Sequence, residues 1–246
     1  MIPIFKSHFS LGRSILTLEP PDSCEEGGSS SIFKLAKDAG LKEVFLLENN
    51  ISSFPYAFDV AKKLGIGLRY GEVFDISTTN GTDKFYSKVG IFSLNDAGFA
   101  ELRELHTKVY VEQGGDINFE QLKVSSNLGL VIPFYDSFLN ANAFTYANFT
   151  YDFGSLKPIF FIEDNGLPQD GILREIAMNY AANHGCEIQE TRTILYESAE
   201  DIDSYMTYRI LCNRGDSKGG GSLEKPNIDY FGSDKFNWER FKRENL

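Results

Sequence analysis

The sequence predicts an α/β domain whose strands form a barrel, and two observations lead to this fold class. Short apolar runs alternate with amphipathic helical patterns over the whole length of 246 residues, and no linker of different composition interrupts them. About seven such strand–helix units fit a barrel better than two separate domains. The hydrophobic fraction of 42% is sufficient for a sizeable core, which excludes a disordered chain.

The expected strands are short apolar runs bounded by glycine or by polar residues. The run Ile2 to Phe5 is the first, and Val44 to Leu47 is wholly apolar, as in a strand that is buried on both faces. A polar turn is expected at 78–83. We expect strands at 2–5, 44–47, 68–76, 88–94, 128–134, 158–162 and 187–195, and their alternation with helices favours a parallel sheet.

The expected helices place apolar residues three and four positions apart. The clearest pattern runs from Ile172 to Ala181, and Gly40 and Gly65 are expected to end the first two helices. We expect helices at 32–39, 56–64, 96–110, 119–124, 172–181 and 202–210.

One domain is expected over residues 1–246, with two distinct segments near its end. Residues 213–227 are rich in Gly, Ser and Lys, which predicts a flexible loop. Residues 228–246 form an aromatic tail, in which Phe236, Trp238 and Phe241 are expected to anchor the segment to the domain body.

Charge and cysteine content exclude several function classes. The net charge is −11 and no Lys/Arg run is longer than two, so we expect contact with DNA to be indirect at most. The three cysteines are far apart and form no CxxC pair, which argues against a disulfide framework or a structural zinc module. No run approaches the ~18 apolar residues of a membrane-spanning helix. We therefore expect a soluble, cytoplasmic protein without membrane contact.

Several segments together resemble the PHP domain at the start of the bacterial DNA polymerase III alpha subunit. They occur in the order that this family shows, and they cover about residues 4–240 of the chain. They are Lys34–Leu41 with Phe45–Asn50, Ala61–Ile66 with Gly71–Phe74, Leu94–Phe99 with Leu102, Glu163–Gln169, and Ser233–Phe236. The resemblance implies a distorted (β/α)7 TIM-like barrel, the PHP fold, with its site at the carboxyl ends of the strands.

Metal-binding members of this family hold a cluster of divalent ions with several histidines and a few carboxylates, and such ions polarise phosphodiesters and generate hydroxide. The resemblance retains four ligand positions here: His8, Glu48, Glu72 and Asp136, or Tyr135 in place of the last. These could hold at most one weak Zn, Mn or Mg ion, and we expect no cofactor. His106 and His184 lie in or just after helices, which is typical of ordinary surface or helix-end histidines.

Most of the family's remaining metal ligands are replaced. The replacing residues are Lys6, Asn49, Lys88, Thr193 and Leu195. A fixed cation reduces the cost of a buried carboxylate. We therefore hypothesise that Lys6 and Lys88 occupy the former metal position and form salt bridges with Glu48 and Glu72.

The resemblance and the lost ligands lead to three functional hypotheses. The first is a non-catalytic PHP domain of, or accessory to, a bacterial or phage replicative polymerase, which binds the polymerase body or the proofreading exonuclease. The second is a metal-dependent phosphoesterase or 3′-5′ exonuclease with a reduced metal site. The third is a free-standing protein that binds the replication machinery through its aromatic tail.

Overall fold

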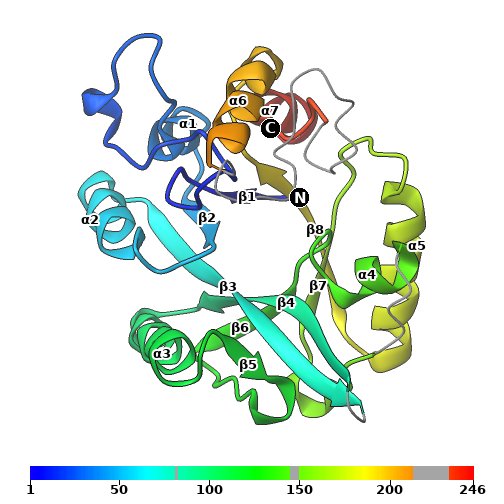
Figure 1. Cartoon of the computed structure of the whole chain (residues 1–246). Coiled ribbons are helices and arrows are strands. Elements are labelled where there is room, and N and C mark those ends of the chain that lie inside the picture. The colour runs from blue at the N-terminus through cyan, green and yellow to red at the C-terminus, as the bar shows by residue number, and fades with distance from the viewer. Residues whose placement is uncertain (81–82, 145–149, 213–232) are drawn as a thin grey trace. The chain divides into compact units, whose positions relative to one another are not determined.

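The computed structural model describes residues 1–80, 83–144, 150–212 and 233–246. Strands and helices alternate along most of the chain, as predicted (Figure 1). The chain groups into two compact units. Unit 1 comprises Met1–Arg69, Asn165–Leu167 and Arg192–Leu246, and unit 2 comprises Tyr70–Asp164 and Pro168–Thr191. The single domain expected over 1–246 stays a prediction.

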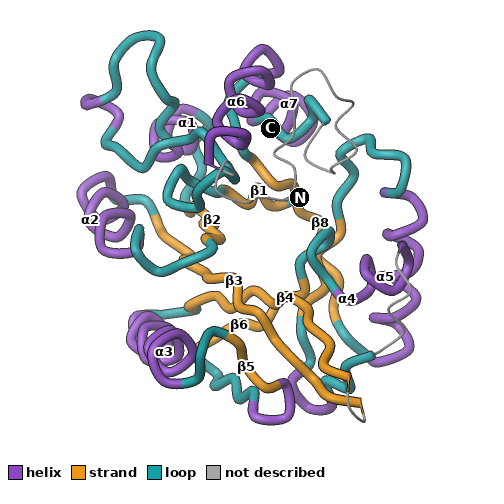
Figure 2. The backbone as a smooth tube through the Cα atoms, viewed as in Figure 1, coloured by secondary structure: helices purple, strands orange, loops and turns teal. Residues whose placement is uncertain are grey.

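The strands form one hydrogen-bonded order that closes on itself. Their order is β2-β1-β8-β7-β6-β4-β3-β5, and β2 pairs in addition with β3, so the ring contains every strand except β5. Two strands belong to both units, because β3 (Gly67–Asn80) begins in unit 1 and β8 (Glu187–Ile194) ends there. Helices lie between the strands in sequence (Figure 2). This connectivity confirms the predicted fold class, an α/β barrel.

In unit 1, two parallel strands end at the same edge. β1 (Ile2–Phe5) pairs with β2 (Glu43–Glu48) so that Ile4 lies opposite Phe45. Four helices belong to this unit: α1 (Ile32–Asp38), α2 (Phe54–Leu64), α6 (Ile202–Cys212) and α7 (Trp238–Asn245).

The aromatic tail is partly helical and packs on β1. Trp238, at the start of α7, is 3% exposed, and its ring centroid lies 5.4 Å from that of Phe5. Phe236 and Phe241 are also buried. The expected flexible loop at 213–227 and the first residues of the tail, 228–232, lie outside the described residues.

In unit 2, a long antiparallel hairpin replaces part of the expected parallel sheet. β3 pairs antiparallel with β4 (Asp83–Ser93), and β4 is antiparallel to β6 (Leu128–Ile132) as well. The parallel arrangement was therefore wrong for β4. It holds for β6, β7 (Ile159–Ile162) and β8. Residues 78–80 look like a turn because they are polar, but they pair across the hairpin.

The helices of unit 2 follow the predicted pattern with three differences. α3 (Asp96–Thr107) and α5 (Asp170–His184) lie where they were expected, and a π-helical turn at Lys108–Glu112 extends α3. The helix expected at 119–124 is a single 3-10 turn. The short α4 (Phe138–Phe144) and β5 (Asp116–Asn118) were not predicted, because neither is long enough to show a period.

None of the helices in the described ranges is both long and apolar enough to cross a membrane.

Candidate functional site

In unit 1, the buried carboxylate of Glu48 is held by two serines. β1 and β2 end side by side, which brings the residues after Phe5 next to the last residue of β2. Glu48 is 0% exposed. Its Oε1 accepts hydrogen bonds from the amide of Ser7, at 3.0 Å, and from the Ser7 hydroxyl, while Oε2 accepts one from the hydroxyl of Ser10. Both oxygens are therefore engaged within the chain.

Lys6 lies close to Glu48, but its hydrogen bonds at this edge go to other groups. Its Nζ donates to the carbonyl of Leu47 at 2.9 Å and to Oδ1 of Asn49 at 3.1 Å. Burial raises the pKa of Glu48, while the hydrogen bonds from Ser10 and Ser7 and the charge of Lys6 lower it, and the net direction is upward. The electrostatic part of our hypothesis thus agrees with the structure, but the predicted direct salt bridge is replaced by hydrogen bonds to neighbouring residues.

His8 is held away from a ligand position by its own loop. Its Nδ1 lies 3.3 Å from the carbonyl of Leu16, and its ring packs against Phe9 with centroids 4.5 Å apart. The hydroxyl of Tyr208 donates to the His8 carbonyl at 3.2 Å. These contacts order the loop after β1.

In unit 2, Glu72 pairs with a histidine of α3. Alternate side chains of β3 are buried, and on this face Phe74 stacks with Tyr110 while Glu72 meets His106. Nδ1 of His106 lies 2.7 Å from Oε1 of Glu72, whose side chain is 0% exposed, whereas that of His106 is 25% exposed. Within the described ranges, Oε2 of Glu72 is buried and has no hydrogen-bond partner.

Burial determines the protonation of this pair. It raises the pKa of Glu72 to about 8 and lowers the pKa of His106. At neutral pH the carboxyl group therefore keeps its proton, which it shares in the hydrogen bond to the neutral imidazole. Burial, followed by the charges of Glu72 and Asp75, raises the pKa of the neighbouring Tyr110 to about 12, so this phenol stays protonated. A carboxyl group that fixes one ring nitrogen leaves the other available as a base.

Lys88 does not neutralise Glu72. Its Nζ lies 2.7 Å from Oδ1 of Asp75, and both side chains of this ion pair are substantially exposed. The predicted Lys88–Glu72 salt bridge was therefore wrong. The cause is the two-residue alternation of β3, which places Asp75 and Glu72 on opposite faces of the strand.

Asp136 lies half-buried between β6 and α4. The neighbouring Tyr135 turns away, and its hydroxyl bonds to Oδ1 of Asp170 at 3.0 Å. Across residues 1–80, 83–144, 150–212 and 233–246, no group of three or more His, Cys, Asp or Glu side chains is arranged to hold a metal ion. The four metal candidates divide between the units: His8 and Glu48 in unit 1, Glu72 and Asp136 in unit 2.

The donors around Glu48 do not suit a cation. A metal ligand must offer a lone pair to the ion, whereas here both carboxylate oxygens accept hydrogen bonds from Ser7 and Ser10. The residues present therefore do not fit the divalent metal that the family resemblance implies, and no step through a metal is derived.

Sequence reasoning missed His106 and the two serines. A helical period does point to His106, because it lies four residues after the buried Leu102 and three before the buried Val109. For Ser7 and Ser10, the sequence offers no such signal, since hydroxyls are common after strands.

Comparisons with known proteins add one likeness. No family model matches the sequence, and no curated protein matches it either. Among solved structures, the chain is similar to a crystal structure from Bifidobacterium adolescentis that is described as a metal-dependent phosphoesterase. The two are 12% identical, the match covers 77% of this chain and 86% of that one, and the TM-score is 0.40. The fold class stands on the strand order and does not depend on this likeness.

Proposed function

We propose that this chain is a PHP-like domain without catalytic activity of its own, which acts as a structural and protein-binding module in DNA replication. One observation carries the first part of this proposal. The carboxylate that resembles a family metal ligand, Glu48, accepts its hydrogen bonds from Ser7 and Ser10, so hydroxyl and amide groups take the place of a cation. The replacement of family ligands by Lys6 and Asn49, which bond to each other, supports the same conclusion.

The proposed partners are the polymerase body and the proofreading exonuclease, in the cytoplasm. The motif resemblance alone supports this part of the proposal. The net charge of −11 favours a protein partner, with DNA held only through that partner.

Two measurements test the proposal. Elemental analysis after incubation with zinc and manganese, followed by desalting, is expected to find no stoichiometric metal. Titration calorimetry is expected to detect binding to the polymerase or to the proofreading exonuclease of the source organism. A tightly held equivalent of metal that is lost in Glu48→Ala would overturn the non-catalytic part, and absence of binding to both proteins would overturn the replication part.

A second candidate is a metal-dependent phosphoesterase or 3′-5′ exonuclease with a reduced site, and the Glu72–His106 pair favours it. A buried carboxyl group that orients a partly exposed imidazole is an arrangement suited to general-base catalysis. Hydrolysis of bis(p-nitrophenyl) phosphate, and of a 3′-labelled oligonucleotide, tests this reading with added Zn, Mn or Mg. Activity lost in His106→Ala but kept in His184→Ala, a histidine that stacks on Tyr180 at 4.0 Å, would support it.

A further inference from the structure

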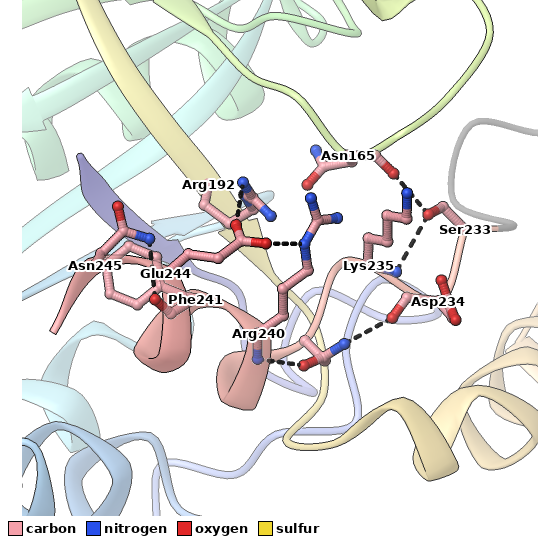
Figure 3. A network of polar contacts seen from close by, with 10 residues as sticks. Asn165, Arg192, Ser233, Asp234, Lys235, Arg240, Phe241, Glu244 and Asn245 are labelled. Atoms are coloured by element: carbon pink, nitrogen blue, oxygen red, sulfur yellow. Dashed lines mark hydrogen bonds and ion pairs between the residues drawn. The ribbon is translucent and has the colours of Figure 1, made fainter.

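Two arginines of unit 1 hold one carboxylate at the end of α7. Nη2 of Arg192, on β8, donates to Oε2 of Glu244 at 3.1 Å, and Nε of Arg240 donates to Oε1 at 2.7 Å (Figure 3). The side chain of Arg192 is only 3% exposed, whereas that of Glu244 is 38% exposed. A guanidinium group is thus buried deeper than the carboxylate that neutralises it.

Three N–H positions of this cluster remain unused. Nε and Nη1 of Arg192 and Nη1 of Arg240 are buried, and among the described residues they have no hydrogen-bond acceptor. A carboxylate has two oxygens, and each oxygen of Glu244 already accepts from one arginine. Buried donors of a charged group are costly when they lack an acceptor. The cluster therefore has more donors than its present occupant satisfies.

A third cation comes from the segment before α7. The hydroxyl of Ser233 donates to the carbonyl of Asn165 at 2.7 Å, which fixes this segment beside residues 165–167. Lys235 extends along the next residue, Gly166, so closely that a Cβ there would collide with the ammonium group. Figure 3 shows Lys235 extending toward Asn165 from this segment.

We propose that Arg192 and Arg240 form a binding site for the phosphate group of a small phosphorylated molecule, and that Glu244 occupies this site until the phosphate displaces it. A phosphate monoester offers three non-bridging oxygens, which suits the unused donors better than a second carboxylate does. The exposed Glu244 lies near the chain end and can swing outward, which opens the site from the outer face of α7.

The electrostatics of Glu244 support this assignment. The hydrogen bond from Arg240, and then the charges of Arg240 and Arg192, hold the pKa of Glu244 below its usual range. An anion is therefore favoured at this position, although the whole chain carries a net charge of −11. The inference rests on unit 1 alone and is independent of the proposed function.

Titration calorimetry with inorganic phosphate, in the presence of EDTA, tests the site in the full-length chain. Glu244→Gln removes the competing charge and is expected to bind phosphate about tenfold more tightly than the wild type. Arg240→Gln is expected to lose this binding, and circular dichroism checks that the variant is folded. The matched control is Glu239→Gln, which makes the same change of charge on an exposed position of α7 and should leave the affinity unchanged.

Equal phosphate affinities in Glu244→Gln and Glu239→Gln would overturn the proposal, because the effect would then be one of overall charge. Unchanged binding in Arg240→Gln would overturn it as well. A nucleoside monophosphate and a sugar phosphate, tested beside inorganic phosphate, identify the source of the group. Tighter binding of one of them, lost in Arg240→Gln, would assign that compound class, and equal binding of all three would assign free phosphate.

Discussion

His106 and Glu72 share a 2.7 Å hydrogen bond between a partly exposed imidazole and a wholly buried carboxyl group. The pair joins α3 to β3 at a point where the surrounding contacts are apolar or aromatic, among them the ring of Tyr110 at 4.8 Å from that of His106. A buried polar pair of this kind fixes the position of a helix more specifically than apolar packing, and its strength depends on pH.

The first prediction concerns the stability of the protein between pH 6.5 and 8. Burial raises the pKa of Glu72 from 4.5 to about 8. The folded state therefore holds a proton that the unfolded state has lost, and the free energy of unfolding falls as the pH rises through this range. The lowered pKa of His106 acts below pH 6.5, where it reduces stability as the pH falls. Wild type is expected to lose about 2 kcal/mol between pH 6.5 and 8.

Urea unfolding at several pH values measures this effect. Glu72→Gln cannot ionise and is expected to show no such fall, while Glu104→Gln, on the exposed side of α3, should behave like wild type. A wild-type stability that is flat from pH 6.5 to 8 would mean that the pair is a carboxylate with an imidazolium ion instead.

The second prediction concerns the hydrogen-bonded carboxylate of Glu48. Replacement by Ala leaves the amide of Ser7 and the hydroxyls of Ser7 and Ser10 without their acceptor in a fully buried place. This change is expected to lower the free energy of unfolding by about 3–5 kcal/mol. Glu48→Gln keeps one oxygen and the side-chain volume, so a smaller loss of about 1–2 kcal/mol is expected.

Chemical denaturation of both variants provides the measurement, with Glu43→Gln on the same strand as a partly exposed control. Equal losses in Glu48→Ala and Glu48→Gln would show that the negative charge, and not the hydrogen bonds, holds the loop.

The sequence was sufficient for the barrel but not for the arrangement inside it. The positions of β1, β2, β7 and α5 follow from apolar periods, which sequence shows directly. The hairpin of β3 and β4 was missed because an antiparallel and a parallel partner impose the same two-residue alternation. The direction of a side chain across that alternation explains why Lys88 meets Asp75 and not Glu72.

The site shows the same limit. Family motifs identified Glu48 and Glu72 as important positions, and both are fully buried carboxylates. Their partners, however, are Ser7, Ser10 and His106, which come from loops and from a helix, and such contacts depend on the tertiary packing of elements. Residue type and spacing alone carry no information on those distances.

The third prediction uses two glycines in the first turns of helices. At Gly98, in α3, a Cβ would collide with the backbone carbonyl of Asn127, which cannot move aside. Gly98→Ala is therefore expected to destabilise the protein by about 1–3 kcal/mol. At Gly171, in α5, a Cβ would meet no atom within 4 Å, so Gly171→Ala is expected to stabilise by about 0.4–1 kcal/mol. Thermal unfolding of both variants tests this, and a neutral Gly98→Ala would show that α3 can shift away from Asn127.

The fourth prediction concerns the anchoring of the C-terminal helix. Trp238 is 3% exposed and contacts both Phe5 and Phe241, with ring centroids at 5.4 and 5.3 Å. Trp238→Ala removes a large buried ring and is expected to cost about 3–5 kcal/mol. Leu246, at 64% exposed, provides the control, because Leu246→Ala should change stability by less than about 0.5 kcal/mol. Trp238 is the single tryptophan of the chain, so its fluorescence reports on the helix directly in the wild type.

That fluorescence separates two ways in which the tail can be held. If α7 is part of the cooperative core of unit 1, the emission of Trp238 shifts to longer wavelength in the same denaturant transition as the far-ultraviolet circular dichroism signal. The buried rings of Phe5 and Phe241 favour this outcome. A fluorescence transition at clearly lower denaturant concentration would mean that α7 detaches first, and the cost of Trp238→Ala would then be confined to that local step.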